Sequence, residues 1–75
     1  MKIRTQDGNQ FLEYGEVFVE PYGDTGQAAV CVVNHFHPEP VYIGIYADAA
    51  RARGVLCEID WYYKERRRVF YAPAE

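Results

Sequence analysis

Three consecutive arginines, Arg66, Arg67 and Arg68, are the strongest charge feature of the sequence. Guanidinium groups bind phosphate in a bidentate fashion, and nearby aromatic rings can stack on a nucleobase. Because alternate residues of a strand share a face, we expect Arg66 and Arg68 to act together, with Tyr63 and Tyr71, as a pocket for a phosphate-bearing, nucleotide-type ligand. The alternative interpretation is a solvated helix end, where basic side chains meet the negative pole of the helix dipole.

Two histidines and two cysteines are the other candidates for chemistry. His35 and His37 are predicted to share a strand face with Cys31, which is a geometry that can hold zinc, but no Cys-x-x-Cys pair or second histidine pair accompanies them. The chain has no serine, so a nucleophile would have to be Cys31 or Cys57 beside a histidine, and only spacing supports that pairing. We therefore expect no metal, no cofactor and no enzymatic activity.

A stripe on the back of the predicted helix is less charged than an exposed face of a monomer should be. It contains Gly54, and a glycine inside a helix costs about 1 kcal/mol relative to alanine, so it often marks the close approach of another surface. We expect a homo-oligomer whose interface contains Gly54, Cys57, Trp61, Tyr42 and Tyr46, with the two tyrosines on the sheet face away from the helix. The alternative is that Trp61 folds over the sheet edge of its own chain.

The hydrophobic pattern predicts the elements that position these residues. Asp7-Gly8 predicts a tight hairpin near the start of the chain, and apolar alternation or continuity predicts strands over 16–22, 27–36 and 41–47. A short aromatic run over 67–72, closed by a proline, predicts an edge strand.

Between these strands, Asp48 is a typical N-cap for a helix over about 48–65. Its predicted core-facing stripe consists of Ala52, Val55, Leu56, Ile59 and Tyr63. The sequence therefore predicts an α+β fold: one domain, residues 1–75, in which an antiparallel meander of four to five strands packs against one helix and a short edge strand follows.

Composition and charge narrow the possible partners. The net charge of −3 argues against a nucleic-acid binder, although the first fifty residues hold two basic and seven acidic side chains and the last 25 hold six basic and four acidic. No apolar stretch reaches the length of a membrane span, so we expect a cytoplasmic protein with reduced cysteines and no membrane partner. The high apolar and aromatic content on so short a chain favours self-association or partner binding.

Residues 43–59, IGIYADAARARGVLCEI, resemble a pattern in small proteins of Gram-positive bacteria, their prophages and integrative elements. That pattern is Leu-Gly-any-Tyr, a Thr helix cap, acidic residues, Arg-Ala and Val-Leu-any-Glu-Ile, and residues 3–8, IRTQDG, resemble the opening of the same proteins. This chain has Asp48 where the pattern has Thr. The resemblance implies a fold and a mobile-element setting, and no activity.

Three classes of function follow. The first is a non-catalytic phage or mobile-element accessory protein that blocks host defence, either by sequestering a nucleotide-type ligand or by covering a host defence protein. The second is an accessory nucleic-acid-binding protein, which only the basic C-terminal third supports. The third is a small enzyme, which the missing catalytic motifs oppose.

Overall fold

The first hairpin pairs two short strands, β1 (Lys2–Arg4) and β2 (Phe11–Glu13), in a computed structural model that describes all residues, 1–75. Gly8 lies in the connecting loop with a φ of 76°, a conformation that glycine adopts without steric cost. The Asp7 carboxylate accepts hydrogen bonds from the Thr5 hydroxyl (2.6 Å) and from the Asn9 backbone N–H (3.0 Å). The predicted hairpin is therefore confirmed, with a loop of residues 5–10.

A second sheet is built from β3 (Glu16–Tyr22), β4 (Gln27–Val33) and β5 (Val41–Tyr46), antiparallel and in the order β3-β4-β5. Residues 28–32 of β4 are all buried, as predicted for a strand covered on both faces. The chain passes from the first sheet to the second at Gly15, where a Cβ would collide with the Val33 carbonyl oxygen and the Asn34 side chain.

A bulge in β5 changes which side chains face the helix. Val30 pairs with Gly44 and Cys31 pairs with Tyr42, so Ile43 is an extra residue between them. Since one extra residue inverts the alternation, Tyr46 lies on the helix side and is only 1% exposed, whereas Tyr42 keeps its place on the outer face. The prediction that Tyr46 lies on an exposed interface was therefore wrong.

The helix, α1 (Ala49–Lys64), covers the inner face of this second sheet. Its first turn is capped by Asp48, whose Oδ1 accepts a hydrogen bond from the Arg51 backbone N–H at 2.8 Å. The predicted helix and cap are confirmed, and Ala52, Val55 and Ile59 are buried. Tyr63 was wrongly assigned to this stripe: it is 50% exposed.

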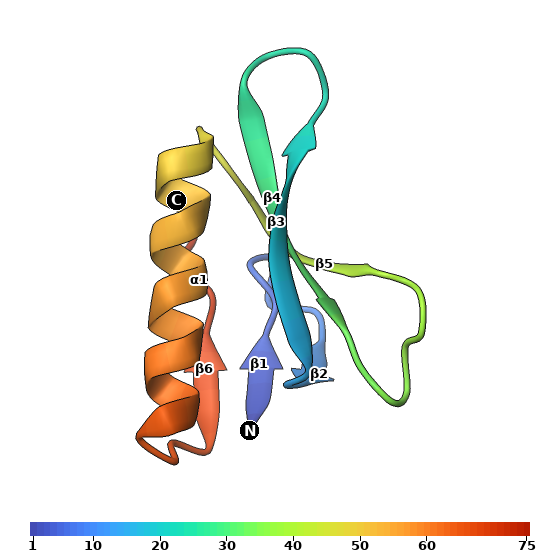
Figure 1. Cartoon of the computed structure of the whole chain (residues 1–75), viewed down its shortest axis with the longest axis vertical. Helices are drawn as coiled ribbons and strands as arrows, with labels where there is room; N and C mark the ends of the chain where they lie inside the picture. Colours follow the sequence, from blue (N-terminus) through green and yellow to red (C-terminus); the bar gives the residue numbers. More distant parts are fainter.

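The last strand, β6 (Val69–Tyr71), lies parallel to β1 and completes the first sheet in the order β2-β1-β6. Its Phe70 is buried beside Ile3 and Leu12, and the three side chains join one core with the helix and the second sheet. Figure 1 shows α1 along one side of the molecule, with the N-terminus, β2 and the C-terminal end of α1 together at the lower end. The predicted α+β class and the C-terminal edge strand are confirmed, and the five meander strands divide between two sheets.

Gln6 joins the two sheets. Its amide donates to the Ile45 carbonyl (2.9 Å) and to the Ala74 carbonyl (2.9 Å), and its Oε1 accepts from the Ile45 N–H (2.8 Å). The Gln6 backbone N–H also donates to the Ile43 carbonyl. The exposed edge of β5 is therefore partly covered by a side chain that imitates a neighbouring strand.

Candidate functional site

The C-terminal end of α1 closes in a Schellman motif that sets the positions of the arginines. The Arg66 N–H donates to the Tyr63 carbonyl and the Arg67 N–H to the Tyr62 carbonyl, each at 3.0 Å. Arg66 occupies the left-handed position of this motif with a φ of 57°, where glycine is the usual residue. Residues 66–68 therefore form a turn, and β6 begins only at Val69.

The Arg67 guanidinium is held against aromatic rings. Its Cζ lies 5.6 Å from the centroid of Trp61 and 5.7 Å from that of Tyr62. Tyr62 in turn packs edge-on against the buried Phe70, with ring centroids 4.9 Å apart. Arg67 is thus linked through Tyr62 to the core, and it is less free to move than an isolated surface arginine.

Tyr63 is positioned by stacking on Tyr14, with ring centroids 4.0 Å apart and planes 9° from parallel. The Tyr14 hydroxyl donates a hydrogen bond to Asp60 at 3.3 Å. Partial burial, together with the negative charge of Asp60, raises the pKa of Tyr14 above its ordinary value. One face of the Tyr63 ring is therefore covered by protein, and the ring remains half exposed.

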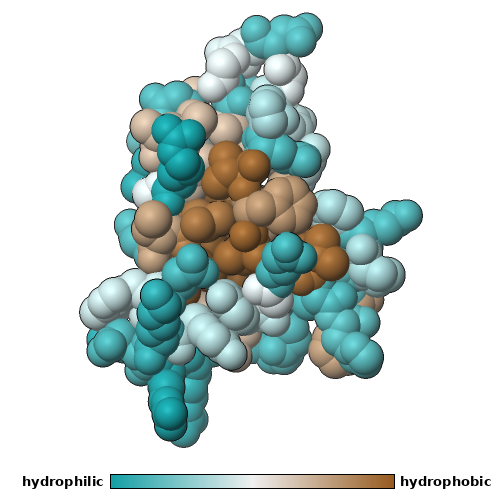
Figure 2. All heavy atoms as spheres, viewed as in Figure 1, coloured by the Kyte–Doolittle hydropathy of each residue, from teal (hydrophilic) through white to brown (hydrophobic).

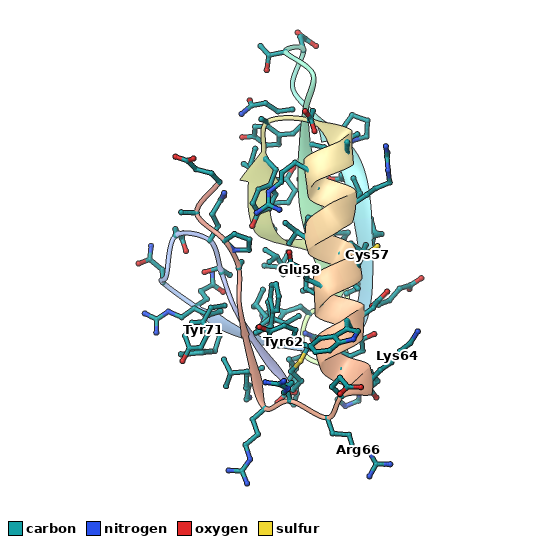
Figure 3. All side chains as sticks on the ribbon, turned by 90° about the vertical axis from the view of Figure 1, so that its left-hand side faces the viewer. Cys57, Glu58, Tyr62, Lys64, Arg66 and Tyr71 are labelled. Atoms are coloured by element: carbon teal, nitrogen blue, oxygen red, sulfur yellow. The ribbon has the colours of Figure 1, made fainter.

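These groups surround an open concavity of about 500 Å³, which we call the helix-end site and define by its lining residues Met1, Tyr63, Lys64, Arg66 and Arg67. Figure 3 shows Lys64 and Arg66 projecting into solvent from this end of the helix. The whole chain has only one ion pair shorter than 4 Å, which joins Lys2 to Glu13 at 2.7 Å. Lys64 and the three arginines at 66–68 therefore have no carboxylate partner.

The structure brings together part of the predicted ligand pocket. Arg66 and Tyr63 both line the helix-end site, but Arg68 and Tyr71 do not. Tyr71 lies farther along β6, where its ring contacts Phe11 with centroids 6.5 Å apart. The prediction that Arg66 and Arg68 act together on one strand face was wrong, because residues 66–68 turn with the helix cap and the site takes Arg67 instead.

The sequence did not place Arg67, Met1 or Lys64 in the predicted pocket, and all three line the helix-end site. Lys64 is the last residue of α1 and comes two positions before the left-handed Arg66. Nothing in the sequence marks position 66 as left-handed, because glycine or asparagine would be the expected signal there. The two histidines do not line the site.

The predicted interface residues on the back of α1 are exposed. Gly54 and Cys57 face solvent, a Cβ built on Gly54 would meet no atom within 4 Å, and Trp61 is 52% exposed. Tyr42 is 46% exposed on the outer face of the second sheet. Figure 2 shows a further apolar area over β3 and the adjoining side of α1, where Val17 and Val19 are partly buried against the core.

The cysteines and histidines lie apart from one another. No group of three or more His, Cys, Asp or Glu side chains is arranged to hold a metal ion. His35 and His37 lie in the loop after β4, so their predicted placement on a strand with Cys31 was wrong. Burial raises the pKa of the Cys31 thiol to about 12, so this thiol stays protonated at neutral pH.

Comparison with known proteins gives no relative: no protein-family model, curated protein or solved structure matches the chain. No helix of the structure has the length and apolar character needed to cross a membrane.

Proposed function

We propose that the chain is a non-catalytic binding protein that holds a phosphate-bearing ligand of nucleotide type at the helix-end site. The observation that carries this proposal is the set of four basic side chains within residues 64–68 that have no carboxylate partner. Glu65 is the one acidic residue of this segment and forms no ion pair, so the four basic side chains repel one another, and a bound anion relieves that repulsion.

The chemistry of the site suits a phosphate with an attached ring. The guanidinium group of Arg67 lies near the rings of Trp61 and Tyr62. The N–H groups of a guanidinium lie along its edges, where they can donate to two phosphate oxygens. Arg66 and Lys64 add donors from the same turn. The half-exposed face of Tyr63 offers a surface on which a base can stack.

The biological setting is part of the proposal. The resemblance of residues 43–59 to proteins of prophages and integrative elements supports a mobile-element setting, and the small size, the aromatic content and the arginine cluster suit an anti-defence role in the cytoplasm of a bacterial host. In that role the chain sequesters a nucleotide-derived signal or covers a host defence protein. The open shape of the helix-end site means that one chain covers only part of a small ligand.

Self-association would supply the missing cover, and two exposed apolar surfaces support it. One is the Gly54, Cys57 and Trp61 stripe, and the other is the outer face of the second sheet, where Tyr42 and the half-buried Phe18 of β3 both pair with Cys31 of β4. We expect a homo-oligomer at micromolar concentration in sedimentation experiments. If the helix stripe is the interface, Trp61→Glu should dissociate the oligomer, and if the interface includes β3, Phe18→Glu should do so. A wild-type protein that sediments as a monomer of 8.7 kDa at every concentration would refute self-association.

The ligand proposal is tested with the fluorescence of Trp61, which is the only tryptophan and lies beside Arg67. Inorganic phosphate, pyrophosphate, mononucleotides, cyclic nucleotides and NAD are titrated separately while emission and melting temperature are recorded. We expect at least one phosphate compound to change the emission and to raise the melting temperature.

Arg67→Ala should weaken that binding about 10- to 150-fold, the equivalent of about 1.5–3 kcal/mol for a charged hydrogen-bond donor. Arg53→Ala is the matched control, because Arg53 is an exposed arginine of α1 that does not line the site. If no phosphate compound changes either signal, or if both variants weaken binding equally, the helix-end site is not a ligand site and a protein target is the better explanation.

A further inference from the structure

The outer face of the first sheet carries an exposed row of two aromatic rings with an arginine between them. Arg4 of β1 pairs with Phe11 of β2 on one side and with Tyr71 of β6 on the other. Phe11 is 50% exposed and Tyr71 is 65% exposed. The neighbouring row of Ile3, Leu12 and Phe70 points inward to the core, so the aromatic row must point outward.

Contacts within the row fix its geometry. The Arg4 guanidinium carbon lies 5.0 Å from the centroid of Phe11, and its Nη2 donates to the Gly8 carbonyl at 2.8 Å. The rings of Phe11 and Tyr71 meet at 74°. Figure 3 shows Tyr71 on the opposite side of the molecule from Lys64. We call Arg4, Phe11 and Tyr71 the aromatic face.

A hollow of about 220 Å³ adjoins this face at β2. It is lined by Lys2, Phe11, Glu13, Phe36 and His37, and Phe36 is 69% exposed. The rings of Phe11 and Phe36, both accessible to solvent, therefore border one concave surface that also contains Lys2.

Positive charge connects the aromatic face to the helix-end site. The parallel pairing of β6 with β1 places Arg68 beside Lys2, whose N–H donates to the Arg68 carbonyl at 2.9 Å. Lys2 and Arg4 are the only basic residues among the first fifty, and the fold brings both of them to the end of the chain that holds the arginines. Because Lys2 is paired with Glu13, the unpaired positive charge on this surface is supplied by Arg4 and Arg68.

We infer that the aromatic face binds single-stranded nucleic acid, with bases stacked on Phe11 and Tyr71 and phosphates held by Arg4, Arg68 and the helix-end site. Exposed rings interleaved with basic side chains are the usual means of binding single strands, because every unpaired base offers a face for stacking. A duplex hides those faces inside its stack. The inference rests on the proposed function for the phosphate contacts and names the ligand class as an oligonucleotide.

The experiment uses fluorescein-labelled ten-nucleotide oligo-dT and oligo-U, with binding measured by fluorescence anisotropy at 50 and 200 mM NaCl. Three phosphate contacts on a single strand should weaken binding about 20-fold over that salt range, since the slope is about 0.7 per phosphate. Tyr71→Ala should weaken it about 5- to 150-fold, the range for loss of one stacked base. Tyr71→Phe should bind like the wild type.

Tyr22→Ala is the matched control, because Tyr22 is a strand tyrosine on the other sheet, is not one of the predicted interface residues and is not predicted to touch the oligonucleotide. Circular dichroism and melting temperature establish that each variant is folded. Arg67→Ala should weaken binding of the oligonucleotide and of inorganic phosphate alike, whereas Tyr71→Ala should weaken only the oligonucleotide.

The outcomes separate this inference from the proposed function. If inorganic phosphate or a mononucleotide binds at the helix-end site and the oligonucleotide binds no more tightly, the inference is overturned and the proposed function stands. Equal effects of Tyr71→Ala and Tyr22→Ala, or equal affinity for a duplex, also overturn it. If Tyr71→Ala weakens oligonucleotide binding and Arg67→Ala does not, the oligonucleotide does not reach the helix-end site and the inference is overturned as stated, whereas the proposed function is decided by the phosphate titrations alone.

Discussion

Replacing Arg66 by glycine should stabilise the fold. Arg66 is the only residue other than glycine with a positive φ, at 57°, and it occupies the position of the Schellman motif that glycine usually fills. An L-residue with a side chain loses roughly 1–2 kcal/mol in this conformation, whereas glycine adopts it freely. Because glycine is also more flexible in the unfolded chain, we expect a net gain of about 1 kcal/mol in the free energy of unfolding.

For a chain of 75 residues, a gain of that size corresponds to a rise in melting temperature of roughly 4–8 °C. Thermal unfolding followed by circular dichroism at fixed pH and salt measures it, and urea titration gives the free energy independently. Arg66→Asn should give a smaller rise, because asparagine tolerates the left-handed conformation better than arginine does.

Arg66→Ala is the decisive control. It removes the charge and keeps the Cβ, so it should not stabilise the protein if backbone strain is the cause. If Arg66→Ala and Arg66→Gly raise the melting temperature equally, the relief comes from reduced repulsion among the basic side chains and the strain argument is wrong. Arg66→Gly should also weaken phosphate binding at the helix-end site, and a glycine variant that binds as well as the wild type would remove any functional reason for the strained arginine.

Three further measurements test other features of the structure. Burial raises the pKa of Tyr46 and of the Cys31 thiol to about 12, so the unfolded chain loses these protons at lower pH than the folded one. Stability should therefore fall as pH rises from about 9 towards 12, by up to about 1.4 kcal/mol per pH unit for each group, and Tyr46→Phe should make the fall shallower in urea titrations across that range. With a thiol-specific reagent at pH 8, Cys57 should react at once and Cys31 only after unfolding, and two fast thiols would contradict the burial of Cys31. Gln6→Ala should lower the free energy of unfolding by about 2–3 kcal/mol because three side-chain hydrogen bonds are lost, whereas a loss below about 0.5 kcal/mol would show that Gln6 does not join the sheets.

Local sequence signals predicted the elements well. The Asp48 cap, the helix stripe at Ala52, Val55 and Ile59 and the apolar run of β4 each depend on residues close together in the chain, and each is confirmed. Long-range pairing left no comparable signal. Nothing near Val69 indicates that β6 lies parallel to β1, or that the meander divides into two sheets at Gly15.

The candidate site was predicted only in part for the same reason. Basic and aromatic composition pointed to the end of the helix, but the choice of Arg67 over Arg68 depends on the left-handed turn at Arg66. The placement of Tyr46 depended on a single bulge residue, Ile43, which inverts the alternation along β5. Both features are decided by contacts with distant strands, which a pattern of neighbouring residues does not contain.

The parallel pairing of β1 with β6 also determines when the protein can fold during synthesis. Residues 2–4 are made more than sixty residues before their partner over 69–71, so one edge of β1 stays open over that interval. The core lacks Phe70 over the same interval, which leaves Ile3 without one of its buried neighbours. The nascent chain therefore presents an unpaired strand edge and apolar surface to chaperones and to other nascent chains, and folding can finish only after Tyr71 has emerged.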